Sequence, residues 1–482
     1  MERRKFLELS SIASLFILTG CGGGSTNNGM GAGMGDGMDG DSGDSGSSLP
    51  SANKNLPIPP AVRGTNFNLN IQQSQHEFFA GMSTSTYAVN GSYLGPTLIV
   101  RNGTGISINY TNSLNERVSM HGHGMHLPAN MDGSTHQEMA PGGAWSARYT
   151  VNQTACTNWY HPHTLHRTGA QTYKGLGGLI IIEDAQSDAL NLPKRYGEDD
   201  IPLVLQDRKF DGNGQFVYAP NMRAIPFGYV GETFIANGAI EPTFDAEAKE
   251  IRFRILNGSN SSVYELGFSD GRSFKQIATD NSFLESPVSM NRLTLTPAER
   301  AEIVVDLSND LGASLSLQEF RHGKTFVHIN VSKNAITTTK VPSRLTNLVK
   351  LNPADATNTR IFNLEGKMGE GLVINGKSMD PSRIDENVPV NNIEIWEINN
   401  KMPIDHNFHI HGTHFRLLER NGSSNIPANE RGYKDTIYVP GRQSVKVIVK
   451  MTDYVDANVP YMYHCHFLEH EDNGMMGQFI VT

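Results

Sequence analysis

Hydrophobic and polar residues alternate along three similar stretches of the chain, residues 89–112, 236–258 and 374–400. Each stretch opens with an Asn-Gly pair, which is a turn signal, and ends in a run with a period of two residues. In the second stretch, Ile251 and Phe253 alternate with charged residues, as in a strand with one buried face. The stretches recur at intervals of about 140 residues, a size that β-sandwich domains favour. The pattern therefore predicts three similar β domains.

Length and composition agree with this prediction. The 482 residues include 48 glycines and 23 prolines, which favour many turns over long helices. The chain is too long for one core, and we expect all-β domains at residues 55–190, 191–340 and 341–482. The net charge of −9 argues against binding to nucleic acid or to an anionic membrane surface. We expect a monomer.

The first 21 residues have the features of an export signal peptide. The basic residues Arg3, Arg4 and Lys5 precede an apolar run at residues 12–18, which is too short to span a bilayer. The sequence "RRKFL" resembles a twin-arginine signal, and "LTGC" resembles a bacterial lipobox with Cys21 as the lipidated residue. We therefore expect a periplasmic or cell-envelope protein of a bacterium with a lipid anchor on Cys21. A plain cleaved signal peptide is the alternative.

Residues 22–54 are rich in Gly, Ser, Asp and Met and cannot form a core. We expect a flexible tether between the lipid anchor and the folded domains. Three of its methionines are spaced by four residues and offer the soft thioethers that bind Cu(I): Met30, Met34 and Met38. A tether that carries methionine without binding copper is the alternative.

Histidines are concentrated in four His-x-His pairs, two in the first repeat and two in the last. Chance would give about 0.6 such pairs for 17 histidines in 482 positions. On a strand, residues i and i+2 point to the same face about 6.6 Å apart, so each pair directs two imidazoles at one spot. The eight residues fit a cluster of three coppers between the first and third domains: His121, His123, His161, His163, His409, His411, His464 and His466.

The last His-x-His pair encloses a cysteine in the sequence "HCHFLEHEDNGMM". Strand alternation places Cys465 on the opposite face from its two neighbours, and His406 on the opposite face from His409. One thiolate, two imidazoles and one thioether form the ligand set of a blue-copper electron-transfer centre: Cys465, His406, His470 and Met475. One strand would then serve two copper sites, with a short covalent path for electrons between them.

With these motifs, the chain from about residue 60 to its end resembles the three-domain multicopper oxidases, the family of laccases, bilirubin oxidases and bacterial copper-efflux oxidases. The resemblance implies three cupredoxin-like Greek-key β-sandwich domains and four copper ions, one of type 1, one of type 2 and a type 3 pair. It also implies an enzyme. One-electron oxidation of a small substrate, such as a phenol, an aromatic amine or Cu(I), would be coupled to reduction of O2 to water.

The resemblance assigns a role to each candidate ligand. The blue-copper set matches the type 1 ligands, and His121 and His409 match the type 2 ligands. The remaining six match the ligands of the type 3 pair: His123, His161, His163, His411, His464 and His466. Two acids, Asp132 and Glu471, resemble the carboxylates that deliver protons to the oxygen site. An ordinary loop carboxylate is the alternative for each.

The sequence departs from the family pattern close to the expected ligands. Gly122 stands where many relatives carry tryptophan, Asn407 replaces the usual proline after His406, and Asp405 precedes that histidine. We expect looser packing beside Gly122 and an altered potential or substrate access near His406. Cys156 is expected to be a small buried residue. Four nearby histidines are not expected to be ligands: His126, His136, His166 and His414.

Three alternatives to a laccase-like enzyme remain: a cuprous oxidase for copper tolerance, a copper-sequestering protein without turnover, and a structural relative that has lost its metals. The complete ligand sets argue against the last two. Copper-efflux oxidases carry a methionine-rich insertion, whereas residues 334–400 hold only Met368 and Met379 here. Met402 also stands where those enzymes have an acid, although Asp405 could replace it. We therefore expect oxidation of phenols and related aromatics in preference to Cu(I).

Overall fold

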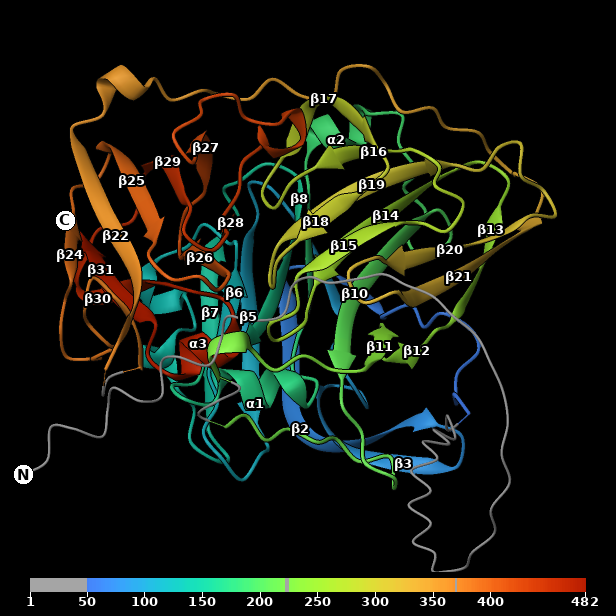
Figure 1. Cartoon of the computed structure of the whole chain (residues 1–482), viewed down its shortest axis with the longest axis horizontal. Coiled ribbons are helices and arrows are strands. Elements are labelled where there is room, and N and C mark those ends of the chain that lie inside the picture. The colour runs from blue at the N-terminus through green and yellow to red at the C-terminus, as the bar shows by residue number, and fades with distance from the viewer. Residues whose placement is uncertain (1–49, 222–224, 369–370) are drawn as a thin grey trace, which may run out of the picture. The chain divides into compact units, whose positions relative to one another are not determined.

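The computed structural model describes residues 50–221, 225–368 and 371–482. The expected signal peptide, the lipid anchor and the expected tether up to residue 49 lie outside these ranges and stay predictions. Strands dominate the regular secondary structure of the described residues and the helices are short, which confirms the all-β prediction (Figure 1). Across the described ranges, no helix has both the length and the apolar character that crossing a membrane requires.

The described strands form six sheets that follow one another in pairs along the chain. The strands of the first pair are β1 (Ala61–Arg63), β2 (Asn66–Phe79), β3 (Met82–Val89), β4 (Thr97–Arg101), β5 (Gly105–Asn112), β6 (Met120–His123), β7 (Ala144–Thr150), β8 (Cys156–Pro162) and β9 (Gly178–Glu183). Their orders are β3-β2-β5-β7 and β1-β4-β9-β8-β6.

The second pair of sheets has no candidate ligand on its strands. These strands are β10 (Asp200–Arg208), β11 (Thr233–Ala236), β12 (Ala239–Ile240), β13 (Thr243–Glu247), β14 (Glu250–Asn257), β15 (Tyr264–Phe268), β16 (Phe274–Ala278), β17 (Phe283–Met290), β18 (Leu293–Leu295), β19 (Arg300–Asp306), β20 (Ser314–Glu319) and β21 (Lys324–Lys333). Their orders are β12-β11-β10-β14-β19-β16-β17 and β13-β21-β20-β15-β18.

The third pair closes the chain. Its strands are β22 (Asn358–Lys367), β23 (Gly371–Ile374), β24 (Glu386–Val388), β25 (Ile393–Asn400), β26 (His406–Ile410), β27 (Phe415–Arg420), β28 (Thr436–Val439), β29 (Ser444–Lys450), β30 (Asp456–His464) and β31 (Met476–Val481). Their orders are β23-β22-β25-β29-β27 and β24-β31-β30-β26-β28. The short α-helices are α1 (Thr168–Tyr173), α2 (Ala185–Ala189) and α3 (Leu468–Asp472).

Each pair of sheets encloses a hydrophobic core of its own. Phe67 lies in the first core, Phe253 in the second and Trp396 in the third, and all three side chains are at most 2% exposed. Each pair lies within one of the three predicted domains, whose boundaries stay predictions. In Figure 1, the orange and red strands of the third domain lie on the left and the yellow-green strands of the second on the right, with the blue and teal strands of the first between and below them.

Two details differ from the simplest expectation from the sequence. Strand β14 is buried on both faces, because Arg254 pairs with Asp200 at 2.8 Å and Arg252 pairs with Glu302. Ion pairs therefore replace solvent on its polar face. The end of the expected tether is also hydrogen-bonded to the body, since the Ala52 N–H donates to the Phe78 carbonyl at 3.0 Å.

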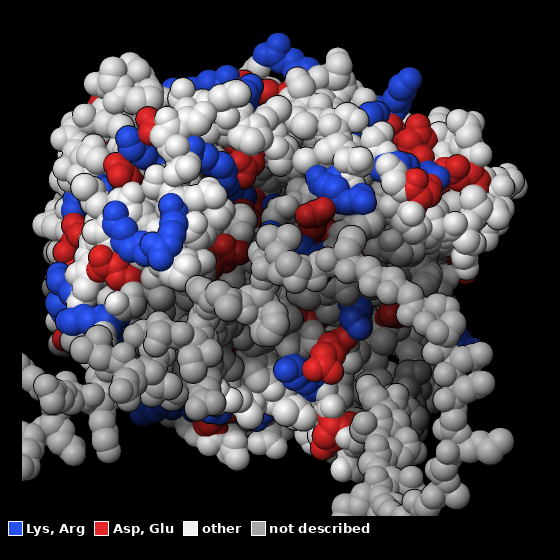
Figure 2. All heavy atoms as spheres, in the orientation of Figure 1, with Lys and Arg blue, Asp and Glu red and all other residues white. Residues whose placement is uncertain are grey.

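Charged side chains are mixed on the face of the molecule that Figure 2 shows. Lys and Arg side chains lie interspersed with Asp and Glu side chains, and neither sign covers this face alone. Among the described residues drawn there, no continuous basic surface is visible.

Candidate metal centres

Eight histidines from the first and third domains meet in one buried cluster. They lie on or just after the strands β6, β8, β26 and β30, and each is at most 1% exposed. Six of them form two groups of three. Within each group, one ring nitrogen of each histidine lies within 4.8 Å of those of the other two: His123, His161 and His466, and His163, His411 and His464. The other two, His121 and His409, form a group with His123.

Strand pairing determines which histidines face one another. In the antiparallel pair β6 and β8, His121 lies opposite His161, and in β26 and β30, His409 lies opposite His464. The second member of three His-x-His pairs follows the strand end, since β8 ends at Pro162, β26 at Ile410 and β30 at His464. Strand pairing thus fixes the position of the first histidine of these pairs, and the turn that follows sets the position of the second.

Hydrogen bonds fix which ring nitrogens remain free. Nδ1 of His411 lies 2.7 Å from Asp132 Oδ2, and Nδ1 of His464 lies 3.1 Å from the Cys465 carbonyl oxygen, so both Nδ1 atoms donate. The two Nε2 atoms keep their lone pairs and face each other at 3.0 Å. Lone pairs this close repel unless a cation lies between them, so this donor set fits a metal ion.

A second pair of nitrogens leads to the same conclusion. The Nδ1 atoms of His121 and His409 lie 2.9 Å from the carbonyl oxygens of Asp132 and Asp435, respectively. Their Nε2 atoms are buried without a hydrogen-bond partner. An unsatisfied buried polar atom costs about 1–3 kcal/mol. A metal ion bound by both rings would satisfy both atoms.

Burial keeps the imidazoles of His163 and His466 neutral. Desolvation is the largest cause that lowers the pKa of His163 and of His466 to about 3 each, from an ordinary value of 6.5. A neutral imidazole retains the lone pair that a metal ion requires. The rings are therefore ready to bind a metal at neutral pH without first losing a proton.

A second candidate centre lies at the end of β30. Cys465 Sγ is 3.5 Å from Nδ1 of His406 and 3.5 Å from Nδ1 of His470, and all three residues are at most 1% exposed. Met475 is fully buried, and its carbonyl oxygen accepts the Cys465 N–H at 3.1 Å. Burial raises the pKa of the Cys465 thiol to about 12, so a thiolate here requires a nearby cation.

Both predicted acids lie beside the histidine cluster. Asp132 is fully buried, and its Oδ2 accepts from His411 as described above. Glu471, on α3, is also fully buried, with Oε2 3.2 Å from His464 Nδ1 and Oε1 3.7 Å from His163 Nε2. Neither carboxylate oxygen of Glu471 has a hydrogen-bond partner. Although burial raises it, the facing imidazoles of His464 and His163 hold the pKa of Glu471 below its usual range, so this carboxylate is ionised.

Asn407 has a larger structural role than the sequence indicated. Its side-chain Oδ1 accepts the His466 N–H at 2.6 Å, and its Nδ2 donates to the Pro297 carbonyl at 2.9 Å and to Thr296 Oγ1 at 3.1 Å. The same Oδ1 lies 3.7 Å from Cys465 Sγ. One amide thus joins both candidate centres to the second domain, which a proline at this position could not do.

We expect Asn407→Ala to lower the free energy of unfolding by about 1–3 kcal/mol, because buried partners of the amide would lose their hydrogen bonds. Urea unfolding of the copper-loaded protein would measure the change. Asn425→Ala, at an exposed asparagine, is the matched control. Equal urea midpoints for the two variants would contradict the structural role of Asn407.

The other residues singled out near the ligands have ordinary surroundings. The space beside Gly122 is filled, since a Cβ there would lie 3.3 Å from Met125 Cγ, so looser packing is not observed. Nε2 of His126 lies 2.9 Å from Asp453, Nε2 of His136 lies 2.8 Å from Gln478, and Nδ1 of His166 lies 2.7 Å from the Asp472 carbonyl oxygen. His414 packs on the Tyr433 ring, and Cys156 is 2% exposed in the core of the first domain.

A cavity of about 420 Å³ lies against the second candidate centre. Its lining includes His470, Phe467, Asp405, Arg321 and the strongly exposed Phe227. The Asp405 carboxylate accepts from the Tyr438 hydroxyl at 2.7 Å and from the Gly441 N–H at 3.1 Å. The cavity would give a small molecule of mixed apolar and polar character access to the buried His470.

Models of the multicopper oxidase family match two parts of the chain, residues 70–187 and residues 341–482. Among curated proteins, the multicopper oxidase mco of Staphylococcus haemolyticus is 37% identical over 427 residues, which cover 86% of this chain and 88% of that protein. The cell division protein FtsP of Sodalis glossinidius is 36% identical over 446 residues, which cover 88% of this chain and 92% of that protein.

Solved structures show the same likeness. The laccase-like multi-copper oxidase CueO of an Ochrobactrum species, described as active towards lignin model compounds, superimposes with a TM-score of 0.84 at 34% identity. This match covers 89% of this chain and 100% of that chain. The multicopper oxidase McoA of Aquifex aeolicus superimposes with a TM-score of 0.83 at 30% identity, with the same coverage of both chains.

Proposed function

Because the chain belongs to the multicopper oxidase family and is an oxidoreductase with cupredoxin-like domains, we propose that it couples one-electron oxidation of phenols and related aromatics to reduction of O2 to water. One observation carries this proposal. Eleven of the twelve candidate ligands, drawn from the first and third domains, come together in buried groups, and the twelfth, Met475, is buried and accepts the Cys465 N–H with its carbonyl oxygen. Storage of copper would not require an electron path between two centres.

The proposal assigns four copper ions to these groups. The type 1 copper would be held by His406, Cys465, His470 and Met475. The type 2 copper would be held by His121 and His409. The type 3 pair would be held by the remaining six: His123, His161, His163, His411, His464 and His466. When bound, copper would supply the one-electron steps and the reduction of O2. The protein would position the ligands, exclude water and deliver protons.

The chain itself provides the connection between the two centres. Cys465 stands between His464 and His466 in the sequence, so the thiolate that receives an electron is covalently joined to two residues of the histidine cluster. The burial of all three residues excludes water from this path. Electron entry at one centre would therefore reach the other within a single segment of chain.

The two acids would serve the proton requirement. Reduction of O2 to water consumes four protons, and the cluster is buried, so a titratable relay has to deliver them. Glu471 faces His464 and His163 with its two carboxylate oxygens, which supports its role in the proton relay. Asp132 holds Nδ1 of His411 and would keep that ring in orientation.

One observation favours a second candidate, oxidation of Cu(I). Asp405 lines the cavity against His470, where its carboxylate could bind a cation, although it is already engaged by Tyr438 and Gly441. The half-buried Met402 lies close by in the sequence and offers a thioether. The likeness to FtsP favours neither substrate, because the printed name describes a cell division protein.

The substrate proposal is tested by steady-state kinetics of the copper-loaded enzyme. We expect kcat/KM for at least one phenol to exceed that for Cu(I), because the cavity combines the aromatic rings of Phe227 and Phe467 with the edge of His470. Asp405→Asn should change Cu(I) oxidation more than phenol oxidation. A much higher kcat/KM for Cu(I) than for every phenol would assign the enzyme to copper tolerance instead.

A location in the cell envelope also remains part of the proposal. It rests on the expected export signal at residues 1–21, and the lipid anchor on Cys21 is a further prediction from the same segment. The monomeric state and possible copper binding by Met30, Met34 and Met38 are likewise predictions. All these residues lie outside the described ranges.

A further inference from the structure

The second domain contributes none of the twelve candidate ligands, but one of its side chains lies directly behind the histidine cluster. Arg300, the first residue of β19, is 1% exposed. Its Nη1 donates to Asp435 Oδ1 at 2.8 Å and its Nη2 donates to Asp435 Oδ2 at 2.6 Å. A guanidinium that binds both oxygens fixes the position and the plane of the carboxylate.

Asp435 in turn acts on a candidate copper ligand. Its Oδ1 lies 2.9 Å from Nε2 of His123. An ionised carboxylate only accepts hydrogen bonds, so the neutral ring has to donate from Nε2 and keep its lone pair on Nδ1. That Nδ1 faces Nε2 of His161 at 3.3 Å, inside the cluster. The carboxylate therefore selects the tautomer that leaves the metal-facing nitrogen free.

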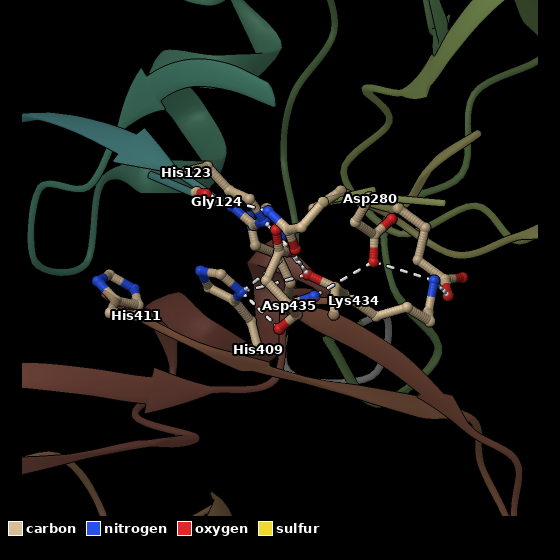
Figure 3. A network of polar contacts seen from close by, with 12 residues as sticks. His123, Gly124, Asp280, His409, His411, Lys434 and Asp435 are labelled. Carbon is tan, nitrogen blue, oxygen red and sulfur yellow. Dashed lines mark hydrogen bonds and ion pairs between the residues drawn. The ribbon is translucent and has the colours of Figure 1, made fainter. Parts of the chain in front are cut away.

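The same residue positions a ligand from the third domain. The carbonyl oxygen of Asp435 accepts from Nδ1 of His409 at 2.9 Å, and Thr436 Oγ1 donates to Asp435 Oδ1 at 2.8 Å. Figure 3 shows His123 and His409 next to Asp435, with Lys434 and Asp280 farther along the network. One aspartate thus orients a ring from the first domain and a ring from the third.

Arg300 also binds the strand that carries His161. Its Nε donates to the Thr157 carbonyl at 2.9 Å and its Nη2 donates to Asn158 Oδ1 at 2.7 Å, both on β8. One guanidinium therefore makes hydrogen bonds to all three domains, since Nη1 also donates to the Ala298 carbonyl at 3.1 Å. Such a contact can fix the position of the first-domain histidines relative to the third-domain histidines.

The residue after His123 is a glycine, which leaves room for this network. Gly124 has φ +79°, and a Cβ there would lie 2.6 Å from atoms of Arg300, Asn158 and Asp435. Only glycine can occupy this position without displacing the ion pair. The last glycine of the sequence "HGHG" is thereby explained by a contact that the sequence analysis did not foresee.

We propose that Arg300 and Asp435 form an inter-domain clamp that fixes the tautomer of His123 and the orientation of His123 and His409, and that the second domain thereby controls copper retention by the cluster. The proposal rests on the proposed function, because it assumes that the cluster binds copper. Arg300 and Asp435 are positioning residues, since they act on copper through the histidines.

The test compares copper retention in Asp435→Asn and Arg300→Lys with the wild-type protein. An amide has the shape of the carboxylate but can donate to Nε2, which permits the other tautomer of His123. Lysine keeps the charge but cannot bind both oxygens in one plane. We expect the cluster copper to be bound about 10–100-fold more weakly in competition with a chelator. Blue absorbance per chain, which reports the Cys465 centre, should stay unchanged.

Arg360→Lys is the matched control. Arg360 also binds a buried carboxylate with two nitrogens, Nε to Glu394 Oε2 at 2.6 Å and Nη2 to Glu394 Oε1 at 2.9 Å, on the outer sheet of the third domain. It should lose comparable thermal stability but no copper. The clamp is supported if both test variants lose cluster copper although their melting temperatures are equal to or above that of Arg360→Lys.

Two other outcomes would contradict the clamp. Copper retention equal to the wild type in both test variants would overturn it and leave the proposed function intact. Parallel loss of blue absorbance and cluster copper would indicate a general structural role instead. If Arg300→Lys fails to fold, Asp435→Asn decides alone, because the amide preserves volume. If the wild-type protein itself binds no copper, the proposed function fails together with the clamp.

Discussion

Replacement of Cys465 by serine is expected to abolish oxidase activity and blue colour while the fold persists. The sulfur lies 3.5 Å from Nδ1 of both His406 and His470, where a thiolate would complete the type 1 ligand set. A serine hydroxyl is a hard, weakly acidic ligand and cannot replace it. Because electrons would enter through this centre, turnover should fall to background. Visible absorption and O2 uptake with a phenol measure the two effects.

Cys156→Ser is the control for this substitution. Cys156 is the other cysteine of the described residues, is buried in the core of the first domain and belongs to none of the candidate ligand groups. It should keep its colour and its activity, and circular dichroism should show that both variants fold. Substantial turnover in Cys465→Ser would refute the assignment of the electron-entry site.

Replacement of Glu471 by glutamine is expected to slow O2 reduction by about 100-fold or more, because general acid catalysis contributes factors of this size. The amide keeps the shape of the side chain but loses the transferable proton. Reduction of the blue centre by substrate without O2 should be nearly unchanged, since that step requires no proton at the cluster. Rapid mixing under anaerobic conditions, followed by O2 uptake, separates the two steps.

Glu469→Gln is the matched control for Glu471. Glu469 lies on the same helix α3 and is 1% exposed, but its carboxylate binds Tyr218 at 2.9 Å and Asn260 at 3.1 Å instead of facing the histidines. Its substitution should leave the rate of O2 reduction close to that of the wild type. If anaerobic bleaching in Glu471→Gln slowed as much as turnover, the relay role of this carboxylate would be wrong.

Asp132→Asn should also slow O2 reduction, partly because the Asp132 carboxylate holds a candidate copper ligand in position. Its Oδ2 accepts from Nδ1 of His411 at 2.7 Å, and its carbonyl oxygen lies 2.9 Å from Nδ1 of His121. The backbone contact survives the substitution, whereas the carboxylate contact becomes an amide contact. We therefore expect slower O2 reduction together with some loss of copper, and metal analysis would detect the second effect.

The candidate ligands could be identified from local patterns in the sequence. Four His-x-His pairs, one of which encloses Cys465, are local patterns, and their chemistry follows from residue type and spacing within a few positions. The three repeats likewise predicted an all-β chain, since period-2 alternation and Asn-Gly turns are local properties of the backbone. Asp132 and Glu471 were found only through the family resemblance, because a single acid carries no pattern of its own.

The surroundings of these ligands, by contrast, follow from the packing of the domains against one another. Arg300, Asp435 and His123 come from three different domains, and no spacing in the sequence connects them. The contacts of Asn407 with Pro297 and His466 arise in the same way. These contacts depend on how whole sheets pack. Burial favours the pairing of polar groups from different domains, because an unpaired buried donor or acceptor costs about 1–3 kcal/mol. Ligand identity is thus local, whereas ligand orientation is a property of the packed domains.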